Sequence, residues 1–489
     1  MKRLPVRSRD QQERSAPRFS RRLVLLAFLA LAGCVPQKQW RQQPFYAVPP
    51  AERAKDVEQR YVIPLDVSGK RLYSLAFVEF KNNGDYWDKR QLDEALHAID
   101  EADRRSNHRA VVVTFIHGWK NNAKQDNNNV LDFRRQLNRV AADACKDDFE
   151  HCGVVGVYMA WSGDIVSRYA DTTRTLTYFD RRDTAIRVAV DPIADAVLKV
   201  MKQVKSGAET NLSVVVGHSF GGLVLEYAIS RQLRIIGDEL HSELGKSATR
   251  DAMQLKSLGD FADLVVLINQ AAPAANAVTT LIQYRGDLER VNLLRPPRQT
   301  SCDAGETQDC KQLTRPLILS VSSETDLATK AVLPVAETIA RPPNGPPSPP
   351  QDQLPEGLTP KKVLTTAAAH TPQLYSHQIV QCANGDCSPC AKLDKYYIPI
   401  SITLPAYAPS NSTGSDEKRK YCVARDRKAW NQTPYWIFEI PTAIVPDHGT
   451  IFTDRFTDFL TSFLPPLESY RSSRPAPAPL QRMTPSRPN

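Results

Sequence analysis

The feature that most constrains the fold of this chain is a series of short apolar runs separated by stretches with helical spacing. A run of roughly four to eight apolar residues without polar alternation is typical of a strand buried on both faces, as in a parallel sheet. Parallel strands are connected by crossovers that usually contain a helix. The sequence therefore predicts an α/β fold with a mostly parallel central sheet and helices on both faces. The runs are RAVVVTFI (109–116), GVVGVYMAW (153–161), NLSVVVG (211–217), FADLVVLIN (261–269) and RPLILSVSS (315–323).

Further strands and helices extend this pattern in both directions. We expect two strands at QRYVIPLDV (59–67) and RLYSLAFVEF (71–80), and a last strand in YWIFEIPTAI (435–444). Helical spacing is found at 129–145, 183–204, 223–233 and 452–464. Pro192 should kink or divide the second of these helices, because proline removes a backbone donor and clashes with the preceding turn.

Three stretches interrupt the alternation of strands and helices and predict insertions at about 232–260 and 337–430. Residues 232–260 are charged and helix-prone, residues 341–360 contain eight prolines, and a polar, cysteine-rich stretch covers about 380–425. The proline-rich stretch should be extended and irregular. Insertions near the carboxyl edge of such a sheet often shape a binding cleft, although they can also be decoration.

The N-terminus predicts export and a lipid anchor. RRLVLLAFLALAGC (21–34) has two arginines, an apolar run too short to span a bilayer, and a cysteine. LAGC resembles the lipobox of bacterial lipoproteins, which implies a signal peptide at 1–33 and acylation of Cys34. The alternative is an ordinary secretory signal with an accidental cysteine. Val35 after the cysteine favours the outer membrane by resemblance to bacterial sorting, so we expect a periplasmic protein held on the cell envelope.

The expected layout is a linker at 34–58, one domain at 59–466 and a disordered tail at 467–489. The net charge of +9 lies mainly at the two ends, since residues 1–33 hold eight basic and two acidic residues and the last twenty hold four arginines. The body is close to neutral, which argues against a nucleic-acid partner. The sequence contains no HExxH motif, phosphate-binding glycine loop or EF-hand pattern, so we expect no cofactor and no metal.

Eight cysteines follow Cys34, an even number that predicts disulfides in an exported protein. Cys145 with Cys152 and Cys302 with Cys310 are the natural local pairs. The other four permit three connectivities, or alternatively a four-cysteine zinc site. These four are Cys382, Cys387, Cys390 and Cys422.

The stretch VVVGHSFGG (214–222) places Ser219 between Gly217 and Gly221, after a strand and before a helix. G-x-S-x-G in this context is typical of a nucleophile elbow, a sharp turn that exposes the serine hydroxyl. The glycines remove side chains that would collide at the turn. The alternative is a small polar residue in a tight turn.

A serine hydroxyl needs a base to accept its proton, and three histidines lie far downstream. We predict that His448 is the base, because it follows the last strand and precedes the terminal helix. His370 and His377 have no strand before them. A surface turn histidine is the alternative for His448.

The base needs a carboxylate to orient it, and SSETDLA (322–328) ends a strand with two. We predict that this acid is Asp326, with Glu324 as the second choice. Asp326 could instead only cap the following helix.

An acyl-transfer intermediate also needs backbone N–H donors for its oxyanion. We expect these from Phe220, directly after the serine, and from Trp119 in the loop HGWKNNA (117–123). His117 is then structural and hydrogen-bonds within this loop.

Taken together, FIHGWKNNA, AWSGD, GHSFGG and SSETDLA resemble α/β-hydrolases of the esterase and lipase kind, in particular a bacterial lipoprotein group without an assigned substrate. The likeness covers about 105–335 well and 435–464 moderately, and departs from the group at Gly163 and in the insertions. It implies a serine hydrolase that cleaves small-molecule or lipid esters through an acyl-enzyme. The alternatives are an acyltransferase with the same residues and a non-catalytic envelope-binding lipoprotein.

Overall fold

The computed structural model describes most of the chain between Tyr73 and Pro465 and a short segment before it. The predicted signal peptide, Cys34, the linker, the strand expected at 59–67 and the C-terminal tail lie outside the described residues. The described ranges are 38–41, 73–145, 151, 153–163, 178–190, 192–208, 210–244, 262–283, 316–339, 349–383, 385–394, 397–404, 417–426, 429–430 and 433–465.

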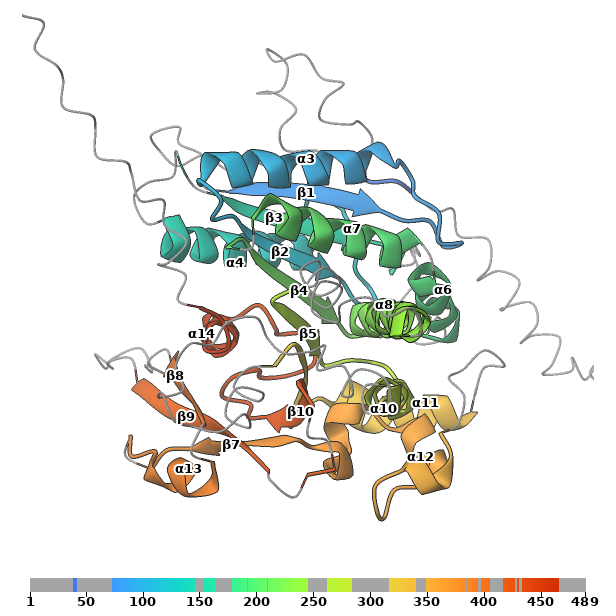
Figure 1. Ribbon diagram of the computed structural model, residues 1–489, viewed down its shortest axis with the longest axis vertical. Coiled ribbons are helices and arrows are strands. Elements are labelled where there is room, and N and C mark those ends of the chain that lie inside the picture. The colour runs from blue at the N-terminus through green and yellow to red at the C-terminus, as the bar shows by residue number, and fades with distance from the viewer. Residues whose placement is uncertain are drawn as a thin grey trace, which may run out of the picture.

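A seven-stranded sheet forms the centre of the molecule, with the strand order β1-β3-β2-β4-β5-β6-β10 (Figure 1). Every neighbouring pair of strands in it is parallel. Seven of the predicted strands are therefore confirmed, along with the α/β class. The strands are β1 Ser74–Glu79, β2 Val111–Ile116, β3 Val154–Ala160, β4 Leu212–His218, β5 Leu264–Ile268, β6 Ile318–Ser323 and β10 Tyr435–Ile440.

Helices connect these strands and cover both faces of the sheet. Pro192 divides the long helical stretch as expected, because α6 ends at Val190 and α7 begins at Pro192. The helices are α3 Arg90–Arg105, α4 Asn128–Cys145, α6 Tyr178–Val190, α7 Pro192–Gly207, α8 Phe220–Leu244, α10 Ala274–Gln283, α11 Leu333–Ile339, α12 Pro360–Thr365, α13 Ser388–Leu393 and α14 Asp454–Thr461.

Two apolar cores lie on opposite faces of the sheet because side chains alternate along each strand. Along β4, Val215 belongs to the core that packs under α3, α6, α7, α8 and α10. Val214 and Val216 belong to the core that packs under α4 and α14. Nearly all the residues of the central strands are buried between these two cores, which explains why the strands are mostly apolar.

The cysteine-rich stretch forms a second, antiparallel sheet with the order β7-β9-β8. Its strands are β7 His377–Gln381, β8 Ile398–Leu404 and β9 Glu417–Arg425. The description of this stretch as polar was wrong for one face, since Ile398, Ile400 and Ile402 join the core under α14. Figure 1 shows the small sheet beside β10 and α14.

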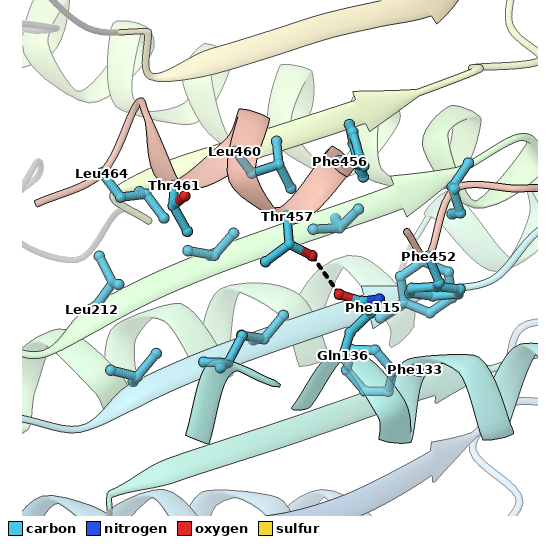
Figure 2. A pocket seen from close by; sticks show the side chains of 16 residues that line it. Phe115, Phe133, Gln136, Leu212, Phe452, Phe456, Thr457, Leu460, Thr461 and Leu464 are labelled. Carbon is cyan, nitrogen blue, oxygen red and sulfur yellow. Dashed lines mark hydrogen bonds between the residues drawn. The ribbon is translucent and has the colours of Figure 1, made fainter. Parts of the chain in front are cut away.

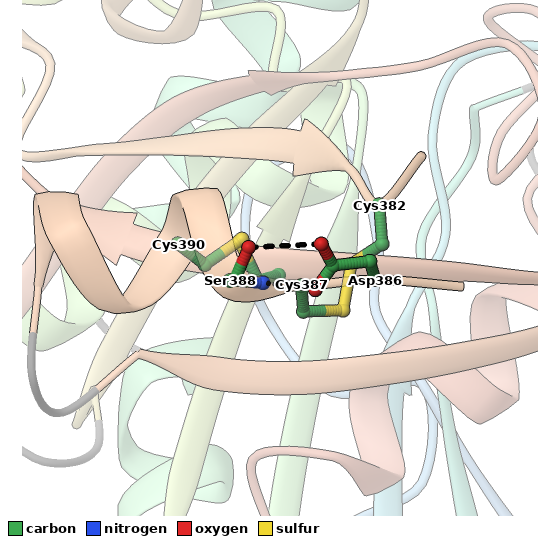
Figure 3. The surroundings of a disulfide bond; sticks show 6 residues. Cys382, Asp386, Cys387, Ser388 and Cys390 are labelled. Carbon is green, nitrogen blue, oxygen red and sulfur yellow. Dashed lines mark hydrogen bonds between the residues drawn. A yellow bond between two sulfur atoms is a disulfide. The ribbon is translucent and has the colours of Figure 1, made fainter. Parts of the chain in front are cut away.

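Two disulfides pair the four cysteines of this stretch. Cys382 is joined to Cys387, with 4.7 Å between their Cα atoms, and Cys390 is joined to Cys422, with 6.3 Å. Figure 3 shows the first of these at the loop before α13, where the Asp386 carboxylate also accepts a hydrogen bond from the Ser388 hydroxyl. All four sulfurs are consumed in these bonds, so the zinc alternative is wrong for this structure.

The remaining cysteine predictions fall mostly outside the described residues. Cys145 is disulfide-bonded. Cys152, Cys302 and Cys310 lie outside the described part of the chain. In the segments that are described, no helix is both long and apolar enough to cross a membrane.

Candidate active site

Ser219 lies in the tight turn between β4 and α8, at the carboxyl edge of the sheet. Its backbone φ is 56°, in the left-handed region that residues other than glycine rarely adopt. Its N–H donates to the Ile268 carbonyl at 3.2 Å, and its carbonyl accepts the N–H of Ala271 at 3.1 Å. These bonds to the end of β5 hold the serine in a strained conformation and present its hydroxyl above the sheet.

The flanking glycines are required by the closeness of this turn to its neighbours. A Cβ atom on Gly217 would stand 2.6 Å from the carbonyl oxygen of Gly221. A Cβ atom on Gly221 would overlap the carbonyl oxygen of Ile116 at the end of β2. Both contacts are with backbone atoms that cannot move aside, which accounts for the G-x-S-x-G spacing.

His448 lies in the loop between β10 and α14, and its ring stands beside Ser219. The distance from His448 Nε2 to Ser219 Oγ is 2.9 Å. On the other side of the ring, Nδ1 lies 2.9 Å from each carboxylate oxygen of Asp326. The His448 side chain is 29% exposed, whereas the Asp326 side chain is completely buried. The ring is therefore partly open to solvent on one side and contacts a buried carboxylate on the other.

Asp326 follows β6 and is held by more than the histidine. Its carboxylate accepts the backbone N–H of Thr329 at 3.2 Å and the Thr329 hydroxyl at 2.5 Å. Burial by itself raises the pKa of Asp326, but the hydrogen bonds from His448 and Thr329 outweigh it and lower the pKa below its usual value. Asp326 is therefore ionised at neutral pH. Glu324, the second choice, instead accepts hydrogen bonds from the backbone N–H and hydroxyl of Thr442 and does not contact the histidine.

Two further side chains hold the backbone of the His448 loop. Asn269, completely buried at the end of β5, donates from Nδ2 to the carbonyls of Asp447 and His448 at 3.0 Å each. His218 lies 2.7 Å from the same His448 carbonyl through Nε2. Since a carbonyl only accepts, His218 carries its proton on Nε2. Burial, followed by the charge of His448, lowers the pKa of His218 to about 3, so its ring stays neutral.

The loop after β2 is ordered around a neutral His117. The backbone N–H of Trp161 donates to His117 Nε2 at 3.1 Å, so Nδ1 carries the proton and donates to the Gly118 carbonyl at 2.8 Å. Trp161 also donates from its indole to the His117 carbonyl at 2.9 Å. Burial lowers the pKa of His117 to about 4. These bonds agree with a structural role for His117.

The two expected oxyanion donors flank the serine. Phe220 is the first residue of α8, and the loop that carries Trp119 comes so close that a Cβ on Gly118 would stand 2.7 Å from the Ser219 Cβ. Neither backbone N–H, of Trp119 or of Phe220, donates to another atom of the described residues. The indole of Trp119 packs on the Phe220 ring, with 6.4 Å between ring centroids. This contact holds the side chain away from the backbone N–H of Trp119.

An apolar cavity of about 90 Å³ lies between α4 and α14, on the sheet face formed by β2 and β4. Figure 2 shows Leu460 and Thr457 of α14 above the strands, with Thr457 hydrogen-bonded to Gln136 of α4. Ser219, Asp326 and His448 do not line it. The cavity therefore belongs to the packing of α14 on the sheet.

Sequence reasoning missed the residues that support the three candidate catalytic groups. His218 ends β4 and Asn269 directly follows β5 at the same sheet edge, and that position was the signal available for them. Thr329 and His370 had no such signal. Thr329 lies in the helical turn after β6, and His370 comes from the stretch interpreted as an insertion. Among the described residues, no cluster of His, Cys, Asp and Glu side chains could hold a metal ion.

No protein-family model, curated protein or solved structure matches this chain.

Proposed function

We propose that this protein is a serine hydrolase of the α/β-hydrolase kind that cleaves carboxylic esters. The observation that carries the proposal is the unbroken line of hydrogen bonds from Ser219 Oγ through His448 to a buried, ionised Asp326. In this line the imidazole faces a hydroxyl on one side and a carboxylate on the other, which is the arrangement needed to activate a serine. The nucleophile, acid and base follow β4, β6 and β10 in the order typical of this fold.

In the proposed reaction, Ser219 Oγ forms a bond to the ester carbonyl carbon while His448 Nε2 takes the hydroxyl proton. Asp326 stabilises the imidazolium that results. The N–H groups of Trp119 and Phe220 donate to the oxyanion, and their freedom from other partners in the described part of the chain supports this role. The carbon–oxygen bond to the alcohol breaks as His448 returns the proton to it. Water, activated by the same histidine, then releases the acid and restores the serine.

Labelling with a fluorophosphonate, which reacts only with an activated serine, tests the proposal. We expect the wild-type protein to be labelled and the variants Ser219→Ala and His448→Ala to remain unlabelled. Ser213→Ala is the matched control, because Ser213 lies buried on the same strand and is expected to leave labelling unchanged. A folded wild-type protein that is not labelled would exclude the hydrolase. Hydrolysis of a graded ester series, with and without an acceptor alcohol, then separates esterase, lipase and acyltransferase.

We further propose that the protein is exported and held on the bacterial envelope through acylated Cys34. The support is the sequence of residues 21–34 alone. Metabolic labelling with an alkyne fatty acid should mark the wild-type protein and not Cys34→Ala, which should be recovered without membranes. Equal labelling of both would contradict the anchor.

A further inference from the structure

The hydrogen bonds around Asp326 continue past the carboxylate to a second buried histidine. The Thr329 hydroxyl, which donates to Asp326, also lies 2.9 Å from Nε2 of His370. On the far side of that ring, Nδ1 lies 2.8 Å from Oε1 of Glu439. A continuous chain of contacts thus joins His448 to Glu439 through Asp326, Thr329 and His370.

The members of this chain come from separate parts of the fold, and the Glu439 side chain at its far end is 28% exposed. Thr329 lies in the π-helical turn Ala328–Val332 after β6, His370 in the short 3-10 helix Ala368–His370, and Glu439 near the end of β10. Thr329 is 1% exposed and the His370 side chain is 4% exposed. Water therefore does not replace the contact between Thr329 and His370, and its hydrogen must be supplied by these two groups.

Counting protons shows that the chain depends on the charge of His370. Thr329 has one hydroxyl proton, which an ionised Asp326 must receive, so Thr329 Oγ1 can only accept from His370 Nε2. Glu439 is also an acceptor, so Nδ1 must carry a proton as well. All contacts are satisfied together only when His370 is an imidazolium. A neutral His370 that keeps Nδ1–H for Glu439 offers a bare Nε2, which competes with Asp326 for the hydroxyl proton.

We infer that His370 is a positioning residue for the catalytic acid, and that its protonation controls, through the Thr329 hydroxyl, how strongly Asp326 holds His448. The functional consequence rests on the proposed hydrolase, whereas the coupling between the two histidines does not. In the protonated state Asp326 keeps its hydroxyl donor. In the neutral state Asp326 shares that donor and directs more of its negative charge to His448.

The groups that face His370 set the pH range of this coupling. Glu439 of β10 is paired both with His370 and with Lys330, whose Nζ lies 3.1 Å from Glu439 Oε1. Burial lowers the pKa of His370, Glu439 and Asp326 act against that lowering, and Lys330 adds to it. Tyr375 also lies near Glu439, and burial and that carboxylate raise its pKa. The neighbouring elements β6 and α10 present no titratable side chain to His370.

The change Thr329→Val removes the hydroxyl while keeping the shape of the side chain. Asp326 loses one donor and the imidazolium form of His448 becomes more stable. We therefore expect the acid limb of the kcat/KM profile to move to higher pH by about half a unit or more. Thr371→Val is the matched control, because buried Thr371 lies beside His370 in sequence but donates to the Ala367 carbonyl. This control should leave the acid limb in place. An unmoved limb in a folded, labelled Thr329→Val protein would overturn the inference.

Nuclear magnetic resonance of histidine-labelled protein tests the coupling without catalysis. The Ser219→Ala protein is titrated, and His370 is assigned by loss of its ring signals in His370→Gln. We expect the Nδ1–H signal of His448 to shift with the midpoint of the His370 titration, and this component to vanish when Thr329→Val is added. The inference would be overturned if the His448 signal did not change over the His370 titration. It would also be overturned if the signal changed equally in the Thr329→Val protein. Failed fluorophosphonate labelling with intact coupling would instead reject only the hydrolase.

Discussion

The clearest expectation concerns Asn269, the buried side chain that holds the His448 loop. It makes three hydrogen bonds, two to the carbonyls of Asp447 and His448 and one from the Ser323 N–H, at 2.9 to 3.0 Å. Asn269→Ala removes all three bonds, and each lost bond lowers the free energy of unfolding by about 1 kcal/mol. Asn269 also has a φ of 48°, which disfavours alanine by about 1 kcal/mol. The total loss is about 4 kcal/mol.

The same change should reduce reactivity, because the loop that carries His448 loses two of the hydrogen bonds that hold it. A displacement of the base by about 1 Å is sufficient to lower the rate roughly 100-fold. The measurements are urea unfolding, and the second-order rate at which a fluorophosphonate labels Ser219 in buffer.

Asn211 provides a matched control at the opposite edge of the sheet. It is 1% exposed and its side chain also makes three hydrogen bonds, from Nδ2 to Asp103 and Val204 and to Oδ1 from the Ala110 N–H. Asn211→Ala should lower the free energy of unfolding by about 3 kcal/mol and leave the labelling rate of the folded protein unchanged. The reasoning is refuted if the two variants, compared as folded proteins, are labelled at similar rates.

Two other predictions follow from close approach and from burial. Gly118→Ala would place a Cβ 2.7 Å from the Ser219 Cβ, so we expect labelling to slow by about 100-fold, whereas Gly449→Ala, with its nearest atom at 3.8 Å, should change it by less than about threefold. Similar rates for these two variants would contradict the packing argument. Burial raises the pKa of Glu226 to about 7 from 4.5, so the folded state retains a proton that the unfolded state releases between these pH values. Stability should therefore fall by about 3 kcal/mol from pH 4.5 to pH 8 relative to Glu226→Gln, and a constant difference in urea unfolding would reject this.

The central sheet and its turn at Ser219 could be predicted because their signals are local. Strands buried on both faces are mostly apolar, as in β4, and the collision that requires Gly217 occurs within one turn. Gly221 is required by Ile116 on the neighbouring strand β2, but the G-x-S-x-G pattern itself can be found in the sequence. His448 and Asp326 could be proposed from their places after strands. Parallel strands bring their carboxyl ends to a common edge, so residues far apart in sequence can be expected there.

The stretch interpreted as an insertion shows where such reasoning stops. Ile398, Ile400 and Ile402 alternate with other residues, a period-two signal for a half-buried strand that was overlooked. Val363 and Leu374, in the same stretch, are completely buried in the other core. A polar average over a long segment conceals these faces, because burial depends on which side of each element meets the sheet.

The sequence by itself therefore determined the α/β class, the elbow around Ser219, and a short set of partners for it. These features depend on periodicity and on the short spacing of glycines around the serine. Only the tertiary structure decided that Asp326 and not Glu324 contacts His448. It also decided that Asn269 and His218 hold the loop of His448, and that His370 contacts Asp326 through the Thr329 hydroxyl. Those contacts join residues up to 230 positions apart, and hydrogen-bond geometry over such separations is set by how the elements pack.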